Sequence, residues 1–245
     1  MKIALIGDIH ANLHALNAVL AHADEQGAQR ILNTGDFVGY GAFPDEVVKM
    51  IRESDSVSIL GNYDEKVLNF KDKKNKWRKS KHHFKWEAFK YAWVHLSKKS
   101  RRFLQSLPLE QELRVMRTGI LLTHGSPASN DEPLSPNTPK GRFQELNRLV
   151  SSDLVICGHS HQPFTRQVGP VLYINPGSVG RPDDGDPRAS YAILTLGDKN
   201  PQVTHFRVEY NVSEAAEAIY TNGLPRAFGE MILKGRDLDT IIATS

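Results

Sequence analysis

Short apolar runs that alternate with helical patterns constrain the fold of this 245-residue chain more than any other feature. Each run is rich in β-branched residues and stops at a polar or glycine-containing turn, which predicts a β-strand. The runs cover residues 3–6, 30–33, 56–60, 119–122, 154–157, 171–174 and 190–196. Helical patterns over residues 13–26 and 44–53 follow the first two runs. Strands alternating with helices predict an α/β fold with a largely parallel sheet, where ligands gather beyond the carboxyl ends of the strands.

Five of these runs end in a polar cluster that contains metal-binding side chains. The clusters are Gly7-Asp8-Ile9-His10, Gly35-Asp36, Gly61-Asn62-Tyr63-Asp64, Thr123-His124-Gly125 and Gly158-His159-Ser160-His161. Asp, Asn and His supply the oxygen and nitrogen donors that divalent Mn, Fe or Zn accept. A single cluster of this kind is weak evidence. Five clusters, each behind its own strand, predict one site for two metal ions.

The five clusters, together with Asn175-Pro176-Gly177-Ser178-Val179 after the sixth run, resemble the calcineurin-like metallophosphoesterase superfamily. Within it, the chain is similar to small bacterial and archaeal predicted phosphodiesterases. The resemblance covers nearly the whole chain, including the closing Gly223-Leu224-Pro225 segment. It implies an α/β fold built as a four-layer αββα sandwich, with two mixed sheets packed face to face and the site at one edge.

The resemblance also assigns the metal ligands. It implies that Asp8, His10 and His161 hold the first metal, that Asn62, His124 and His159 hold the second, and that Asp36 bridges the two. Two such cations can clamp a phosphoryl group, neutralise its oxygens and lower the pKa of the attacking water. The expected nucleophile is a metal-bridging hydroxide held by Asp36. Mn is the most expected metal, and Fe, Zn, Ni or Co suit the same donors.

One position departs from the family pattern. The residue between Asn62 and Asp64 is usually a His that protonates the leaving group, but here it is Tyr63. A phenol, with a pKa of about 10, donates a proton less readily at neutral pH than an imidazole. The general acid is therefore left open. Tyr63 could contact the substrate by stacking or could simply pack, and Asp64 is expected to be structural rather than catalytic.

Positive charge is concentrated in residues 66–102. This segment has fourteen Lys or Arg but only two acids, a local balance of +12 in a chain whose formal net charge is +3, so the remainder carries −9. Residues 70–81 lack an amphipathic period, which indicates an exposed loop, whereas residues 84–107 carry apolar residues at helical spacings and predict two helices that end at Pro108. Residues 66–107 are therefore expected to form a basic helical cap over the metal site.

Two interpretations of the basic segment compete. It is either a solvated charged face anchored by Trp86 and Trp93, or an electrostatic funnel that draws a polyanion to the metals. Basic residues interleaved with aromatics also suit a nucleotide or single-stranded nucleic acid. The histidines without metal-ligand spacing are expected in packing or at the surface: His14, His22, His82, His83, His95 and His205.

Two loops are expected to shape the substrate pocket. The connection over residues 125–139 contains four prolines, which exclude a helix or a central strand, and a long loop beside a metal ligand is often functional. Arg181, after the sixth strand, is a candidate for phosphate binding. The alternative is a surface Arg paired with Asp183 or Asp184. Asn12 is a candidate to hold the first loop in place.

Length and composition agree with an enzyme of one domain. A chain of this size with 40% hydrophobic residues can bury a full core, so we expect a single domain over residues 1–245. The single cysteine, Cys157, cannot form an internal disulfide, which favours a reducing cytoplasm. The N-terminal apolar run is too short for a signal peptide, and no run is long enough to span a membrane.

These observations predict a dinuclear metal-dependent phosphohydrolase that cleaves phosphodiester or nucleotide polyphosphate bonds, with a phosphate-ester small molecule or nucleotide as substrate. A phosphomonoesterase or protein phosphatase is the alternative, and a nuclease or a non-catalytic scaffold is less favoured. The full set of seven ligand residues argues against a scaffold, and the confinement of basic charge to one segment argues against a pure nucleic-acid-binding module. The sequence leaves open the oligomeric state and the role of residues 208–245.

Overall fold

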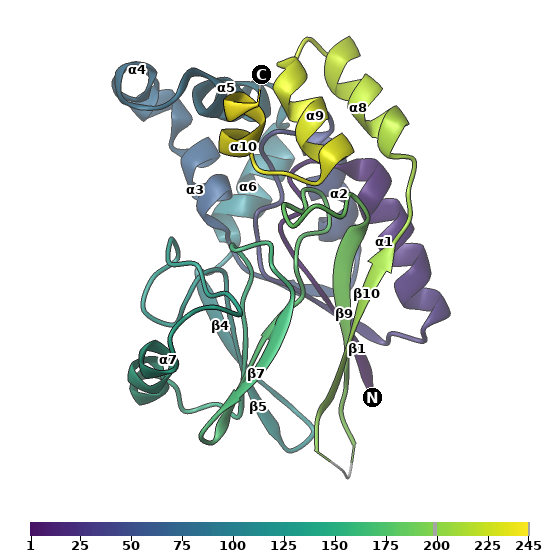
Figure 1. The fold of residues 1–245 in the computed structure, drawn as a ribbon, viewed down its shortest axis with the longest axis vertical. Helices are drawn as coiled ribbons and strands as arrows, with labels where there is room; N and C mark the ends of the chain where they lie inside the picture. The colour runs from purple at the N-terminus through teal and green to yellow at the C-terminus, as the bar shows by residue number, and fades with distance from the viewer. Residues whose placement is uncertain (198–199, 245) are drawn as a thin grey trace.

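Two five-stranded mixed sheets form the centre of the molecule (Figure 1). The computed structural model describes residues 1–197 and 200–244. The first sheet has the order β10-β9-β1-β2-β3, and its strands are β10 (Gln202–Val208), β9 (Ala189–Thr195), β1 (Lys2–Ile6), β2 (Arg30–Asn33) and β3 (Ser56–Ser58). The second has the order β4-β5-β6-β8-β7, and its strands are β4 (Glu110–Val115), β5 (Thr118–Thr123), β6 (Leu154–Ile156), β8 (Val171–Asn175) and β7 (Phe164–Val168).

Each sheet combines a parallel centre with antiparallel edges. In the first sheet β1, β2 and β3 are parallel, and in the second β5, β6 and β8 are parallel. The other neighbours are antiparallel: β9 pairs with β1 and β10, β4 with β5, and β7 with β8. The expectation of a largely parallel sheet was therefore right only for the strands that helices or long loops connect. The mixed sheets that the family resemblance implied are confirmed.

Alternating side chains divide the sheets into layers. On β1, Ile3 and Leu5 point between the sheets, where they join Ile120, Ile156 and other residues of the second sheet in one buried cluster. Ala4 and Ile6 point the other way, toward the helices on the outer face of the first sheet. On the second sheet, Leu121, Val155 and Tyr173 face outward onto Phe143 and Leu146 of α7 (Lys140–Leu146). The result is the expected αββα order, with a thin outer layer over the second sheet.

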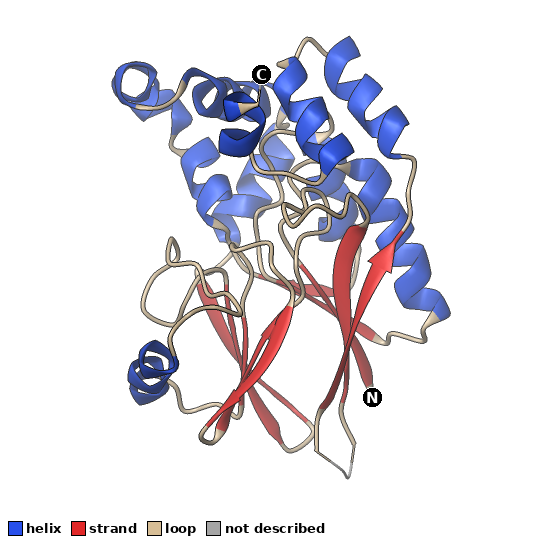
Figure 2. Ribbon diagram, viewed as in Figure 1, coloured by secondary structure: helices blue, strands red, loops and turns tan. Residues whose placement is uncertain are grey.

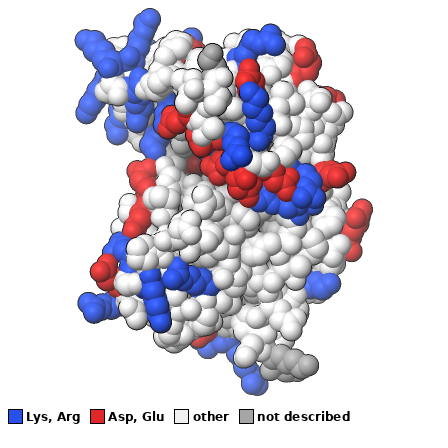
Figure 3. Space-filling view, in the orientation of Figure 1, with Lys and Arg blue, Asp and Glu red and all other residues white. Residues whose placement is uncertain are grey.

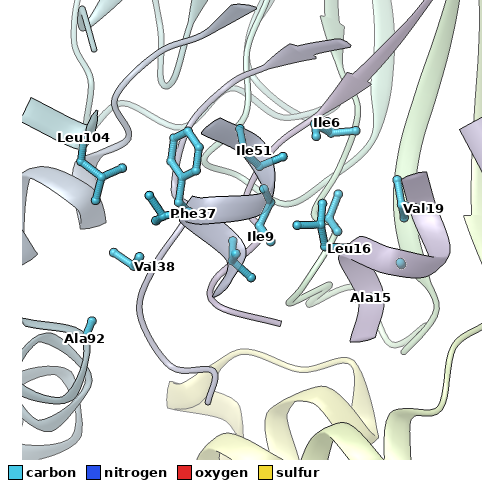
Figure 4. Packing of buried hydrophobic residues seen from close by; sticks show 14 of the residues in the cluster. Ile6, Ile9, Ala15, Leu16, Val19, Phe37, Val38, Ile51, Ala92 and Leu104 are labelled. Carbon is cyan, nitrogen blue, oxygen red and sulfur yellow. The ribbon is translucent and has the colours of Figure 1, made fainter. Parts of the chain in front are cut away.

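The outer layer over the first sheet begins with α1 (Leu13–Glu25) and α2 (Pro44–Glu53), close to their predicted bounds. Both helices are amphipathic, so one face of each packs on the sheet. Leu16 and Val19 of α1 lie in one cluster with Ile6 and Ile9, and Phe37 and Ile51 belong to the same cluster (Figure 4). This packing places the loop that follows β1 next to the loop that follows β2.

Four helices follow the third strand of the first sheet. They are α3 (Asn62–Leu68), α4 (Phe70–Ser80), α5 (His83–His95) and α6 (Lys98–Ser106). The two helices predicted over residues 84–107 are thus confirmed, and the exposed loop predicted over residues 70–81 is wrong. The α4 segment contains neither Gly nor Pro, and its aromatics pack on α5, with ring centroids 5.5 Å apart for Phe70 and Trp86 and 5.6 Å for Trp77 and Phe89. The α4 helix is therefore stabilised by its packing on α5, although its sequence has only a weak amphipathic period.

The predicted exposure of this segment is confirmed. Phe70 is the one residue of α4 that is fully buried. Lys and Arg side chains gather over α4 and the adjoining end of α5, at the upper left of the space-filling view (Figure 3). His82 and His83 are exposed there, as expected.

The C-terminal segment completes the helical side of the molecule. Residues 208–245 contain α8 (Val212–Thr221), α9 (Arg226–Lys234) and α10 (Leu238–Ala243), while Ser245 lies outside the described residues. These helices pack on Tyr40, Ala42 and Ala88 in one buried cluster, so they join the cap to the loop that follows β2. In the described part of the chain, no helix is long and apolar enough to cross a membrane.

The sequence runs located seven of the strands within two residues at each end. The strands β4, β7 and β10 were not predicted as strands. All three are sheet-edge strands with mixed polar sequences, such as Glu-Gln-Glu-Leu-Arg-Val in β4. An edge strand exposes one face or one side to water, so it need not carry the apolar run that identifies a buried strand.

Candidate metal centre

The polar clusters meet because the parallel strands of both sheets end at one edge. Asp8 follows β1, Asp36 follows β2 and Asn62 opens α3 just beyond β3. His124 follows β5, and the pair of histidines at 159 and 161 follows β6. The loops that leave these strands lie between the sheets and the helices (Figure 2). Ligand binding beyond the carboxyl ends of parallel strands is the rule for such sheets.

Two overlapping groups of side chains have the geometry of metal sites. Asp8, His10 and His161 form one group, and Asp8, Asp36 and His124 form the other, each with its ligand atoms within 4.8 Å of one another. His161 Nε2 lies 3.3 Å from Asp8 Oδ1 and 3.2 Å from His10 Nε2. The Asp36 Oδ2 atom lies 3.5 Å from His124 Nε2 and 3.8 Å from His10 Nε2. Asp36 thus stands between the two groups.

The imidazole rings are oriented by backbone carbonyls. His10 Nδ1 contacts the Val38 carbonyl at 3.3 Å, and His124 Nδ1 contacts that of Thr34 at 2.8 Å. His161 Nδ1 makes the same contact with the Arg181 carbonyl at 2.8 Å. Since a carbonyl only accepts, each Nδ1 carries the proton and each Nε2 presents a lone pair. This leaves the lone pairs of His10 and His161 facing each other, an arrangement that a cation between them stabilises.

Buried polar atoms without partners give a further test of the fit to a metal. Among the residues that the structure describes, His124 Nε2 and Asn62 Oδ1 are both buried without a hydrogen-bond partner. Buried polar atoms are normally hydrogen-bonded, so such exceptions indicate a missing ligand or ion. Both atoms belong to side chains that the sequence assigned to the second metal. The donor set therefore fits two divalent cations.

Burial governs the electrostatics of this centre. Burial raises the pKa of Asp8, and it raises the pKa of Asp36 well above its usual range, with the nearby Asp8 charge as the next cause. Burial lowers the pKa of His10 and His161 well below the usual value, and it lowers the pKa of His159 to about 4. A neutral imidazole can bind a cation through its lone pair. The charge of a bound cation would also stabilise the two buried carboxylates in their ionised form.

The backbone at the centre is strained. The φ angles of Asp8, His10, Asp36, His159 and His161 are all positive, between 48° and 64°. Residues other than glycine seldom adopt this left-handed region, and such strain concentrates at functional sites. The adjoining glycines permit close approach: a Cβ on Gly61 would overlap the backbone nitrogen of Asp36. Gly61 is thus required for close packing against the Asp36 loop, whereas Gly35, with a φ of 93°, also needs the conformational freedom of glycine.

Asp131 in the proline-rich loop contacts Asn62 and His159, two of the three side chains that the family resemblance assigned to the second metal. The carboxylate of Asp131 accepts hydrogen bonds from Asn62 Nδ2 and, at 2.8 Å, from Lys66 Nζ. Its backbone carbonyl lies 3.1 Å from His159 Nε2, so that nitrogen is the donor. Because Asp131 engages the donor atoms of Asn62 and His159, the amide oxygen of Asn62 and the Nδ1 lone pair of His159 point away from Asp131. The ring of His159 lies 5.1 Å from that of His124.

A pocket of about 350 Å³ opens beside this centre. Its lining includes His10, Asp36, Asn62, His159 and His161 from the strand ends, Lys66, Lys81, Lys85 and Phe89 from the cap, Tyr40, Tyr63 and Arg181 from the loops, and Asp237, Leu238 and Asp239 from the C-terminal segment. This volume lies within the range of about 300–1,000 Å³ that is usual for small-molecule sites. The cap thus borders the metal centre, as expected.

Comparison with known proteins agrees with this geometry. Residues 1–199 match the sequence profile described as the Calcineurin-like phosphoesterase superfamily domain. The chain belongs to the calcineurin-like phosphoesterase superfamily.

Relatives cover the chain almost from end to end. An uncharacterized protein of Methanocaldococcus jannaschii is 36% identical over 254 residues, which span 96% of this chain and 98% of that protein. The phosphodiesterase YfcE of Escherichia coli is 26% identical over 204 residues, 79% of this chain and 87% of YfcE. The crystal structure of a metallophosphoesterase from Sphaerobacter thermophilus superposes with a TM-score of 0.78 at 29% identity, covering 96% of this chain and 99% of that chain.

Tyr63 stands where the family resemblance implies a His, and Asp64 follows it. The Tyr63 hydroxyl is hydrogen-bonded to that of Tyr40, and its ring packs against Phe89 with centroids 5.1 Å apart. Burial raises the pKa of Tyr63 well above its usual range, which makes the phenol a still weaker acid. Asp64 accepts backbone hydrogen bonds from Phe37, Val38 and Gly61, at 3.0–3.2 Å. These contacts favour a packing role for Tyr63 and a structural role for Asp64.

Arg181 lies in the pocket rather than at the surface. Its guanidinium carbon stands 4.7 Å from the centroid of the Tyr40 ring, and Nη2 lies 3.3 Å from His161 Nδ1. Of the two acids considered as partners of a surface Arg181, Asp184 pairs with Arg207 instead, whereas the charge of Asp183 helps to raise the pKa of Arg181. Burial tends to lower the pKa of Arg181, but nearby tyrosines and acids raise it, so the guanidinium stays charged.

The loop-supporting roles fall partly on residues that the sequence did not assign. Asn12 caps α1 by accepting from the Ala15 nitrogen at 3.1 Å and donates to the Gly180 carbonyl at 2.9 Å, as proposed. Ser178 Oγ donates to the Asp8 carbonyl at 2.7 Å. Ser178 belongs to the cluster after β8, in which no metal ligand was assigned. The rule that strand ends meet at one edge could have identified it, whereas no sequence signal singles out Asp131.

Proposed function

We propose that this family member is a phosphohydrolase that uses two divalent cations and cleaves phosphodiester or nucleotide polyphosphate bonds. The observation that carries the proposal is the pair of overlapping ligand groups, which share Asp8 and have Asp36 Oδ2 between them. Two cations held in such a pair supply positive charge to the phosphoryl oxygens and lower the pKa of a bound water. The pocket beside them has the size and the positive side chains that a phosphate ester requires.

The proposed ligand assignment follows the sequence. Asp8, His10 and His161 hold the first cation, Asn62, His124 and His159 hold the second, and Asp36 bridges them. Mn is the proposed metal, with Fe, Zn, Ni and Co as chemically suitable alternatives. The Tyr63 backbone nitrogen donates to Asp36 Oδ1 at 2.7 Å, while Asp36 Oδ2 lies near His10 and His124, so Asp36 would be held in place between the residues that would bind the two cations.

The proposed substrate preference follows from the absence of an imidazole at position 63. The buried phenol of Tyr63, with its raised pKa, does not offer a proton to an alkoxide leaving group. Bonds whose leaving group is a phosphate or a phenol need less protonation, so the protein acts on them faster than on alkyl esters. Arg181 is the proposed contact to a phosphoryl oxygen, because its buried guanidinium lines the pocket.

We also infer that residues 1–245 form one domain, with residues 66–107 as its cap. The buried cluster that joins α8–α10 to Tyr40, Ala42 and Ala88 supports this inference. We propose that the protein is located in the cytoplasm. The one cysteine, Cys157, is a free buried thiol whose pKa is raised by burial to about 12, which is compatible with that location.

The test is hydrolysis of two matched aryl substrates in the presence of Mn. Bis-p-nitrophenyl phosphate is a diester and p-nitrophenyl phosphate is the corresponding monoester, and both release the same leaving group. We expect faster turnover of the diester, loss of turnover in Asp36→Asn, and normal turnover in Asp55→Asn, which makes the same change at an exposed position. Faster turnover of the monoester would instead establish a phosphomonoesterase, and turnover that survives in Asp36→Asn would exclude the proposed centre.

A further inference from the structure

The wall of the pocket that the cap provides is lined by three lysines. Lys66 comes from α3, Lys81 from the turn between α4 and α5, and Lys85 from α5. Lys66 Nζ is paired with Asp131 at 2.8 Å. Within the described parts of the chain, neither Lys81 nor Lys85 has a carboxylate oxygen within ion-pair distance. Two ammonium groups thus face the pocket without a counter-ion.

Aromatic contacts hold Lys81 at this wall. Its Nζ stands 5.4 Å from the centroid of the Trp77 ring and 6.0 Å from that of Phe89. A cation over an aromatic face is attracted to it, so the side chain is directed and not freely solvated. Burial lowers the pKa of Lys81, and the neighbouring charges of Lys66 and Lys85 lower it further. The three amines therefore repel one another in the absence of a bound anion.

The part of the lining that comes from the C-terminal segment carries the reverse charge. Asp237 and Asp239 flank Leu238 at the start of α10 and line the same pocket. The carboxylate of Asp237 caps α10 by accepting from the Thr240 nitrogen at 2.8 Å. An anionic extension of a substrate held at the metal centre is repelled by this part of the lining and attracted to the cap wall. The field across the pocket thus gives such an extension one direction.

We propose that Lys66, Lys81 and Lys85 form a subsite for a second phosphate group, so that the substrate is a phosphate ester with a further phosphate next to the scissile one, of the nucleoside polyphosphate class. This inference rests on the proposed function, because it takes the scissile phosphate to lie at the metal centre. It narrows that function from phosphate esters in general to esters with at least two phosphates. The aromatic rings at this wall are packed among themselves, so the subsite recognises phosphate charge rather than a base.

The test compares ligands that differ by one phosphate. Calorimetric titration of the Mn-loaded protein with ADP and with AMP measures what the second phosphate adds to affinity. We expect the dissociation constant of ADP to be at least about tenfold lower than that of AMP, because one hydrogen bond to a charged group changes affinity by about that factor. In the double variant Lys81→Ala/Lys85→Ala most of this difference should be lost, because only Lys66 of the subsite remains. The matched control Lys98→Ala/Lys99→Ala removes the same charge from exposed positions of α6 and should keep the difference.

The outcomes separate this inference from the proposed function. Equal affinities in the unaltered protein, or a difference that survives the Lys81/Lys85 change, would overturn the subsite. Turnover of bis-p-nitrophenyl phosphate, which has no second phosphate, should be unchanged in the control variant Lys98→Ala/Lys99→Ala, and in the unaltered protein it tests the proposed reaction separately from the subsite. If that diester is hydrolysed and ADP has no advantage over AMP, the phosphohydrolase stands and the subsite falls. If ADP is favoured but no diester is turned over, the subsite stands and the proposed reaction falls.

Discussion

The strand ends and the cap over them are built in opposite ways. The candidate metal-binding side chains at the strand ends are nearly all buried, most of them lie on strained backbone, and three of the imidazoles are oriented by backbone carbonyls. The cap helices present exposed lysine side chains. In α4, Phe70 is the single buried residue. Preorganised groups suit a reaction that needs fixed charges, whereas exposed cations attract anionic substrates from solution. This difference agrees with our proposal that the reaction takes place at the strand ends and that the cap selects the substrate.

The largest effect is expected at the strand ends. Asp36→Asn removes the carboxylate that lies between both ligand groups. We expect diester turnover to fall by about 10³-fold or more, beyond the 10–100-fold that is usual for residues that only orient a metal ligand. Steady-state kinetics with Mn in excess measures the loss. A fall of less than tenfold would show that the reaction does not depend on these loops.

A gain is expected at the boundary between the two regions. Tyr63→His places an imidazole where the phenol of Tyr63 lines the pocket. Since general acid catalysis contributes at least about 10²-fold, turnover of alkyl phosphodiesters should rise by a factor of that order. Turnover of the aryl diester, which needs little protonation, should change only a few-fold.

The matched variant Tyr63→Phe removes the hydroxyl and keeps the ring. We expect no gain on alkyl esters and nearly normal aryl turnover, because burial already makes this phenol a poor acid. If Tyr63→His brings no gain on alkyl esters, the missing imidazole does not explain the expected substrate preference. If Tyr63→Phe abolishes activity, the Tyr63 hydroxyl is itself required for the reaction.

A smaller effect is expected where the cap and the strand ends meet. Asp131 positions Asn62 and His159 while it pairs with Lys66. Asp131→Ala should weaken one of the two Mn equivalents by about 10–100-fold, as is usual for residues that orient metal ligands. Metal titration by calorimetry measures this directly. Asp131→Asn keeps an oxygen that can accept from Asn62 and should recover most of the affinity; equal losses in both variants would indicate a charge effect rather than positioning.

The smallest effects are expected in stability and should differ between the regions. Val155 is fully buried between the second sheet and α7, whereas Val94 on α5 is 63% exposed. Val155→Ala should lower the free energy of unfolding by about 2–3 kcal/mol, through lost burial and a cavity. Val94→Ala should change it by less than about 0.5 kcal/mol. Urea denaturation measures both, and similar losses would show that the cap is packed as tightly as the sheets.

The same contrast explains what the sequence could predict. Asp8, Asp36 and His124 were identified because buried strands have strong apolar runs and because their ends must meet at one edge. The α4 helix was missed because its stability comes from Trp77 packing on α5, a tertiary contact that no local period encodes. Asp131 was missed because a proline-rich loop has no periodicity to place its side chains. Arg181 was named as a candidate, but its burial beside Tyr40 required the fold.

The most direct test of the central claim is the number of divalent cations that the strand ends bind. Calorimetric titration of the chelator-treated protein with Mn should show two equivalents per chain. The same titration of Asp36→Asn should show at most one tight equivalent, because Asp36 is the proposed bridge between the two groups. One equivalent or none in the unaltered protein, or two undiminished equivalents in the variant, would contradict the two-metal centre.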